Sequence, residues 1–161
     1  MSEMASLIFF VQKHVTFWTS FIVLNFLIIK SWRETMAYVY FCNNPKKRCT
    51  IGDCVCRALS LALNKAWDEV YIDLVTEGFA VKDMPSANEV WSSYLYSKGF
   101  YKKSTFNQYS YSIEDFCNDH PYGIYVVCTG THVVCCKNGD YFDTWNSGQE
   151  EVTFYFERED Y

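Results

Sequence analysis

The strongest constraint on the fold is a change of sequence pattern at Pro121. Before this residue, apolar side chains recur every three or four positions, as on one face of a helix. After it, short runs rich in Val, Tyr, Phe and Cys alternate with turn residues, and Asn138-Gly139 is typical of a two-residue β-hairpin. Helices followed by an antiparallel meander predict an α+β domain with the helices on one side of the sheet.

The same patterns give approximate positions for the elements. A short strand is predicted at Ala37–Cys42, with a loop from there to Gly52. Helices are predicted at residues 54–65, 67–77 and 88–97, and Gly78 is expected to stop the second. Ser112, with a carboxylate three residues later, has the pattern of a helix N-cap. The strands predicted after Pro121 are Gly123–Cys128, Thr131–Lys137, Tyr141–Trp145 and Val152–Phe156.

Residues 1–35 differ in composition from residues 36–161, which are expected to form the globular domain. The stretch from Leu7 to Ile29 (residues 7–29) is long and apolar enough to suggest a transmembrane helix, although Gln12-Lys13-His14 interrupts it. If it inserts, the basic residues on its C-terminal side keep the domain in the cytoplasm. The alternative is that synthesis starts at Met36 and residues 1–35 are a spurious upstream extension. A cleaved signal peptide is less favoured, because no small-residue cleavage site follows.

Charge and cysteine content exclude other classes of function. The net charge is −5 and the one basic cluster, Lys46–Arg48, is short, so nucleic acid is not expected as a partner. The chain is long enough to fold without disulfides, and its later cysteines lie in apolar runs. Most of the cysteines are therefore expected to be core residues in a reducing compartment. The eight cysteines are at positions 42, 49, 54, 56, 117, 128, 135 and 136.

Three residues carry the pattern of a thiol nucleophile and its partners. Cys54 stands where a helix is predicted to begin, and the unpaired amides and helix dipole there favour a thiolate. His132 opens a predicted strand, and Asp143 lies on the next strand of the Asn138-Gly139 hairpin. A cross-strand carboxylate can orient an imidazole, so Cys54, His132 and Asp143 are the predicted catalytic residues.

An acyl-transfer site also needs donors for the oxyanion. The backbone amide of Cys54 is one candidate, and Asn43, Asn44 and Thr50 are candidates for the second. Asp53 is ambiguous, since an acidic neighbour opposes thiolate formation unless it mainly caps the helix. Cys56 points to another side of the helix and is expected to be core.

The order Cys, His, Asp, with the nucleophile at a helix start and its partners on a C-terminal sheet, resembles the papain-like cysteine peptidase superfamily. The segment GDCVCRALS resembles the nucleophile motif of ovarian-tumour-type deubiquitinases. HVVCCKNGDYFDTWNSG resembles bacteriocin-processing and related bacterial and phage peptidase-like proteins. Three positions depart from these families, namely Arg48, Ile51 and Val133.

The resemblance implies a papain-like fold and a cysteine peptidase or isopeptidase that cleaves a peptide or peptide-like amide, with a protein or peptide as partner and no cofactor. A papain-like binding module with little or no turnover is the second hypothesis. The third is a zinc-stabilised module, whose ligand spacing fits poorly. Its ligands would be Cys42, Cys49, Cys54 and Cys56. The sequence does not indicate an oligomeric state.

Overall fold

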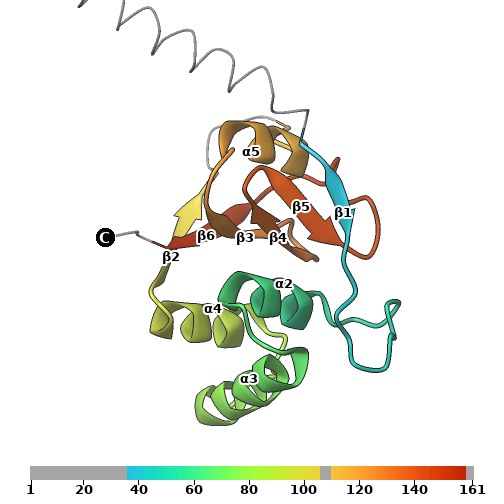
Figure 1. Ribbon diagram of the computed structural model, residues 1–161. Coiled ribbons are helices and arrows are strands. Elements are labelled where there is room, and N and C mark those ends of the chain that lie inside the picture. The colour runs from blue at the N-terminus through green and yellow to red at the C-terminus, as the bar shows by residue number, and fades with distance from the viewer. Residues whose placement is uncertain (1–35, 106–109, 159–161) are drawn as a thin grey trace, which may run out of the picture. The chain divides into compact units, whose positions relative to one another are not determined.

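The structure is a computed structural model in which residues 36–105 and 110–158 are described. Residues Met36–Tyr161 form one compact unit of helices and a mixed sheet (Figure 1). The α+β class predicted from the sequence is therefore confirmed. The elements of the described residues are β1 (Tyr38–Tyr40), α2 (Cys54–Leu63), α3 (Trp67–Val81), α4 (Asn88–Ser97), β2 (Phe100–Ser104), α5 (Ile113–Asp119), β3 (Ile124–Cys128), β4 (Val133–Lys137), β5 (Asp140–Asp143) and β6 (Phe154–Arg158).

The strands are ordered β1-β5-β4-β3-β6-β2 across the sheet. Strands β3, β4 and β5 form the expected meander, and Asn138 and Gly139 both adopt positive φ in the turn between β4 and β5. Two pairings differ from a simple antiparallel meander, in which each strand would pair only with the next strand along the chain. The early strand β1 pairs in parallel with β5, and β6 returns to pair with β3. Both are pairings between distant parts of the chain, which local sequence patterns do not encode.

The helices cover both faces of the sheet, which corrects the expectation of one covered face. One set of core residues joins α2, α3 and α4 to Val126 and Cys135. The other set joins α5 to Val127, Val134 and Cys136, which are next to Val126 and Cys135 in strands β3 and β4. Because successive strand residues point to opposite faces, α5 packs on the face away from α2, as Figure 1 shows. The near-continuous apolar runs of β3 and β4 follow from this double burial.

Some element boundaries also differ from the predictions. Gly78 does not end α3, which continues to Val81. A Cβ at Gly78 would lie 2.7 Å from the carbonyl oxygen of Asp83, so glycine permits the following turn to fold back against the helix. Strand β2 was not predicted, and β5 ends at Asp143, two residues earlier than expected. The predicted cap at Ser112 is confirmed, since its hydroxyl accepts a hydrogen bond from the Asp115 amide.

The cysteines divide into two groups. Five free cysteines are buried, as predicted for core residues: Cys56, Cys117, Cys128, Cys135 and Cys136. Cys42 and Cys49, in contrast, form a disulfide that closes the loop between β1 and α2. This disulfide was not predicted, because the chain is long enough to fold without disulfides and most of its cysteines were expected to be free core residues.

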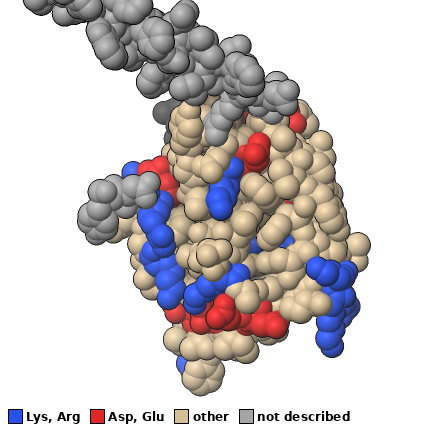
Figure 2. All heavy atoms as spheres, in the orientation of Figure 1, with Lys and Arg blue, Asp and Glu red and all other residues tan. Residues whose placement is uncertain are grey.

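Charged side chains on the visible face lie in small groups of both signs, separated by uncharged surface (Figure 2). The predicted membrane segment, residues 7–29, lies outside the described residues. Within 36–105 and 110–158, every helix is too short or too polar to cross a bilayer. The expectation of a transmembrane helix therefore finds no support among the described residues, and we do not propose a membrane anchor.

Candidate active site

Cys54 is the first residue of α2, as the sequence predicted. Its side chain is half-buried, whereas the other free thiols in the described residues are buried. The backbone amides of Val55, in the first turn of the helix, and of Val133, at the start of β4, both donate to its sulfur. The first amides of a helix have no partner within it and carry partial positive charge. The sulfur is therefore surrounded by donors that favour a thiolate.

His132 immediately precedes β4, and Asp143 is the last residue of β5. The antiparallel pairing of these strands brings the start of one beside the end of the other. The Nε2 atom of His132 lies 2.6 Å from Oδ2 of Asp143, which leaves the Nδ1 side of the ring to face Cys54. Asp143 is almost fully buried at 1% exposure, and its Oδ1 accepts a hydrogen bond from the Thr144 amide at 2.7 Å.

The Cys54 thiol and the His132 imidazole also share a hydrogen bond, and it shifts both pKa values. Burial raises the pKa of Cys54, but the hydrogen bond and charge of His132, together with the Val133 and Val55 amides, outweigh burial and lower it overall. Burial lowers the pKa of His132, yet its hydrogen bonds to Asp143 and Cys54 raise it to about 9. The two shifts act in the same sense, since both favour a thiolate–imidazolium pair over a neutral thiol and imidazole. Burial raises the pKa of Asp143, but the hydrogen bond to His132 is among the contacts that lower it overall.

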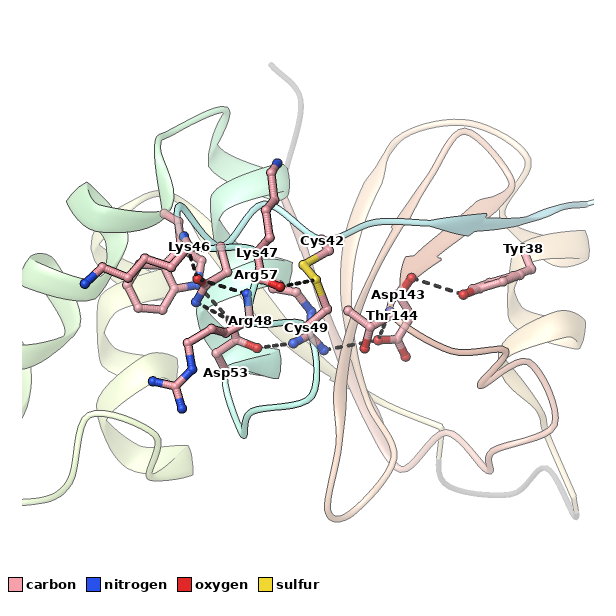
Figure 3. The surroundings of a disulfide bond; sticks show 12 residues. Tyr38, Cys42, Lys46, Lys47, Arg48, Cys49, Asp53, Arg57, Asp143 and Thr144 are labelled. Carbon is pink, nitrogen blue, oxygen red and sulfur yellow. Dashed lines mark hydrogen bonds and ion pairs between the residues drawn. A yellow bond between two sulfur atoms is a disulfide. The ribbon is translucent and has the colours of Figure 1, made fainter.

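A buried ion-pair network that the sequence analysis missed lies beneath this triad. Arg57, one turn after Cys54 on α2, forms ion pairs with Asp53 and, at 3.2 Å, with Oδ1 of Asp143 (Figure 3). The nucleophile helix and the carboxylate that orients His132 are thus joined by one guanidinium. The signal available in the sequence was an arginine in the apolar helix segment CRALSLAL, four residues after Asp53.

The network resolves the ambiguity of Asp53. Its side chain makes no capping hydrogen bond at the start of α2. Instead, Oδ1 pairs with Arg57, and Oδ2 accepts from Nε1 of Trp67 at 3.0 Å. Because a buried cation and hydrogen-bond donors already hold this carboxylate, its charge opposes the Cys54 thiolate less than an unpaired aspartate would.

The candidate oxyanion donors occupy different environments. Asn44 is buried, and its side-chain Nδ2 donates to Asp53 at 3.4 Å while Oδ1 accepts from the Lys46 amide. Thr50 lies in an exposed turn. Asn43 donates to the Ser60 hydroxyl at 2.8 Å. The remaining candidate for an oxyanion donor is the backbone amide of Cys54, which belongs to the nucleophile residue itself at the first position of α2.

Trp145 is a second residue that the sequence analysis did not assign to the site. Its ring centroid lies 5.5 Å from that of His132, and 46% of its surface remains exposed. It covers part of the imidazole next to the open side of the site. The available signal was its position two residues after Asp143, at the end of the strand predicted at Tyr141–Trp145.

The cysteines of the zinc hypothesis are divided among three environments. Cys42 and Cys49 bond to each other, Cys54 faces His132, and the buried Cys56 thiol donates to the Trp67 carbonyl at 3.8 Å. Burial raises the pKa of Cys56 to about 12, as for an inert core thiol. In the part of the chain that the structure describes, no group of three His, Cys, Asp or Glu side chains is placed to hold a metal ion.

Comparisons of the chain with protein-family models, with curated proteins and with solved structures find no match. The papain-like resemblance therefore stays a prediction that rests on sequence motifs. The chemistry inferred for the site depends on the geometry described above, independently of any relative.

Proposed function

We propose that this protein is a cysteine peptidase- or isopeptidase-like hydrolase that cleaves a peptide or peptide-like amide by acyl transfer. The observation that supports the proposal is the convergence of Cys54, His132 and Asp143. They come from a helix start and two strands, and a continuous line of hydrogen bonds connects them. A structural core cysteine needs neither a histidine partner nor a lowered pKa, and Cys54 has both.

The proposed reaction has two steps. The Cys54 thiolate attacks the substrate carbonyl carbon, the C–N bond breaks, and His132 gives its proton to the leaving amine, which leaves a thioester on Cys54. Water then attacks the thioester carbonyl while His132 accepts a proton from that water. The carboxylic acid product leaves and the thiolate is restored. Asp143 holds the imidazole in place, and the Cys54 amide donates to the oxyanion in both steps.

The test is the pH dependence of Cys54 alkylation by iodoacetamide in the full chain. Because His132 lowers the pKa of Cys54, we expect alkylation to begin below the usual thiol range and the five buried free cysteines to react far more slowly. Replacing His132 with Ala should move the profile toward the ordinary thiol pKa of 9.0. A wild-type profile identical to that of His132→Ala would overturn the proposal.

One observation favours a binding module with little turnover as the second candidate. The Asn44 side chain is engaged with Asp53, and Thr50 is exposed, so neither stands ready as a second oxyanion donor. Mass spectrometry after mixing with a p-nitrophenyl ester discriminates the two functions. A hydrolase is expected to show a thioester on Cys54 that decays as free acid appears, whereas a binding module shows no turnover and is unaffected by Cys54→Ala.

A further inference from the structure

A cavity of about 380 Å³ lies between the start of α2, α3 and the turn after α3. Its size falls within the range of pockets that bind small ligands or side chains. Asp53 and Val55, the neighbours of Cys54 on either side, both line it. The cavity is thus next to the proposed nucleophile in the chain, and part of its wall comes from α3, which contributes nothing to the triad. Its apolar walls are Ile51, Val55, Trp67, Tyr71, Leu74 and Pro85.

The cavity offers no free charge to a ligand. Among the described residues that line the cavity, Asp53 alone is charged. Both of its carboxylate oxygens are occupied, one by Arg57 and the other by Nε1 of Trp67. The Cys56 thiol, which also lines the cavity, has its pKa raised to about 12, chiefly by burial, and stays neutral. A charged group would lose its hydration here without gaining a partner, so an uncharged, apolar occupant is favoured.

Two stacked aromatic rings form part of the cavity wall. The rings of Trp67 and Tyr71 stack with centroids 5.1 Å apart and an interplanar angle of 7°. Tyr71 is 46% exposed, so the cavity opens to solvent along this pair. The opposite wall exists because Gly78 lets the turn carrying Pro85 approach α3 closely. Aromatic or large aliphatic side chains gain most from such a surface.

The apolar surface continues beyond the cavity along α3. Tyr71, Val75 and Phe79 are all exposed and follow one another at intervals of four residues, so they lie along one side of the helix. This row spans about 12 Å of helix axis. One small amide is too short to cover both the row and the cavity. The exposed Asp68 precedes the row by three residues, and its charge acts on the Cys56 thiol inside the cavity.

We propose that this cavity is a specificity pocket for a large apolar side chain, preferably aromatic, of a polypeptide substrate. The substrate crosses the start of α2 toward Cys54, and a basic residue next to the apolar one faces Asp68. This inference rests on the proposed function and names its substrate class. The substrates are polypeptides in which an aromatic residue stands next to a basic one, and small amides are not expected to be substrates. Charge complementarity at Asp68 and the neutral cavity together select this occupant over an acidic or polar segment.

The test uses the full chain carrying Cys54→Ala and two fluorescein-labelled pentapeptides that differ at one residue, Gly-Gly-Phe-Lys-Gly and Gly-Gly-Ser-Lys-Gly. We expect the Phe peptide to bind about tenfold more tightly by fluorescence anisotropy, as burial of one aromatic side chain predicts. Ser86→Phe, which fills the cavity from its exposed rim, and Tyr71→Ala should each weaken Phe-peptide binding about fivefold or more. The matched control is Tyr101→Ala on β2, because Tyr101 has the same 46% exposure and should leave binding unchanged.

The outcomes separate this inference from the proposed function. If Cys54 is alkylated with a lowered pKa but the two peptides bind equally, or neither binds at about 1 mM, the hydrolase proposal stands and the pocket assignment is overturned. If the Phe peptide binds selectively and Tyr71→Ala weakens it, but wild-type Cys54 behaves as an ordinary thiol, the cavity is a peptide-binding pocket without a substrate role and the catalytic proposal falls. Circular dichroism of each variant checks that the fold is kept.

Discussion

Replacing Arg57 with Met is expected to destabilise the protein more than any surface charge change. Arg57 is 4% exposed and is the cation that joins two buried carboxylates, Asp53 and Asp143. Methionine has similar length and keeps much of the packing, but it leaves both carboxylates without this partner. Asp143 would keep only the contacts to His132 and its own loop, so the position of the imidazole should also loosen.

The expected magnitude follows from this burial. Removing one partner of a buried ion pair costs about 3–5 kcal/mol, because the remaining charge stays desolvated. For a domain of this size, such a loss lowers the melting temperature by about 10–20 °C. The matched control is Lys65→Met. The Lys65 ammonium lies 2.6 Å from its partner Asp73, but both side chains are about one-third exposed, so the expected cost is below about 1 kcal/mol.

Urea unfolding followed by circular dichroism measures both variants, and iodoacetamide reaction at pH 7 reports the site. Arg57→Met should also slow Cys54 alkylation, whereas Lys65→Met should not. Adding Asp53→Asn to Arg57→Met should recover about 1 kcal/mol or more, since it removes one unpaired charge. If Arg57→Met costs no more than Lys65→Met, the buried network does not hold the site together and the reasoning is refuted.

Two further changes test how the loops around the site are built. Gly78→Ala should cost about 1–3 kcal/mol in urea unfolding, because its Cβ would meet the Asp83 carbonyl oxygen at 2.7 Å. Gly52→Ala should stay within about 0.5 kcal/mol, since nothing lies within 4 Å of its Cβ; equal costs would contradict the close turn. Cys42→Ser should cost about 2–3 kcal/mol by releasing the loop closed at Cys49. Alkylation of unfolded wild-type protein should raise its mass by two more carbamidomethyl groups with reductant than without, and equal masses would rule out the disulfide.

Local signals accounted for the parts of the fold that local contacts determine. The start of α2 at Cys54 and the turn at Asn138-Gly139 were placed correctly, because helix periodicity and positive φ leave clear marks in the sequence. The parallel pairing of β1 with β5 joins segments about a hundred residues apart. No local pattern specifies such a partner, so this part of the sheet was not predicted.

The candidate site shows the same division. Cys54, His132 and Asp143 were chosen for their residue types and order, and the structure brings them together. The roles of Arg57 and Trp145 depend on tertiary contacts, with Asp143 and His132 respectively, and were missed. Gly78 was misread as a helix stop, since a glycine that permits close packing leaves the same mark in the sequence as one that ends a helix.

The position of the nucleophile early in the chain has a consequence for synthesis. Apart from the adjacent Val55 amide, the groups that lower the pKa of Cys54 are His132 and the Val133 amide, which lie almost eighty residues after it. A nascent chain that has been translated only as far as α4 therefore lacks both of these groups. If the proposed function is correct, the reactive thiolate forms fully only after β4 and β5 join the sheet, so the order in which the segments are made would delay its reactivity until the domain is nearly complete.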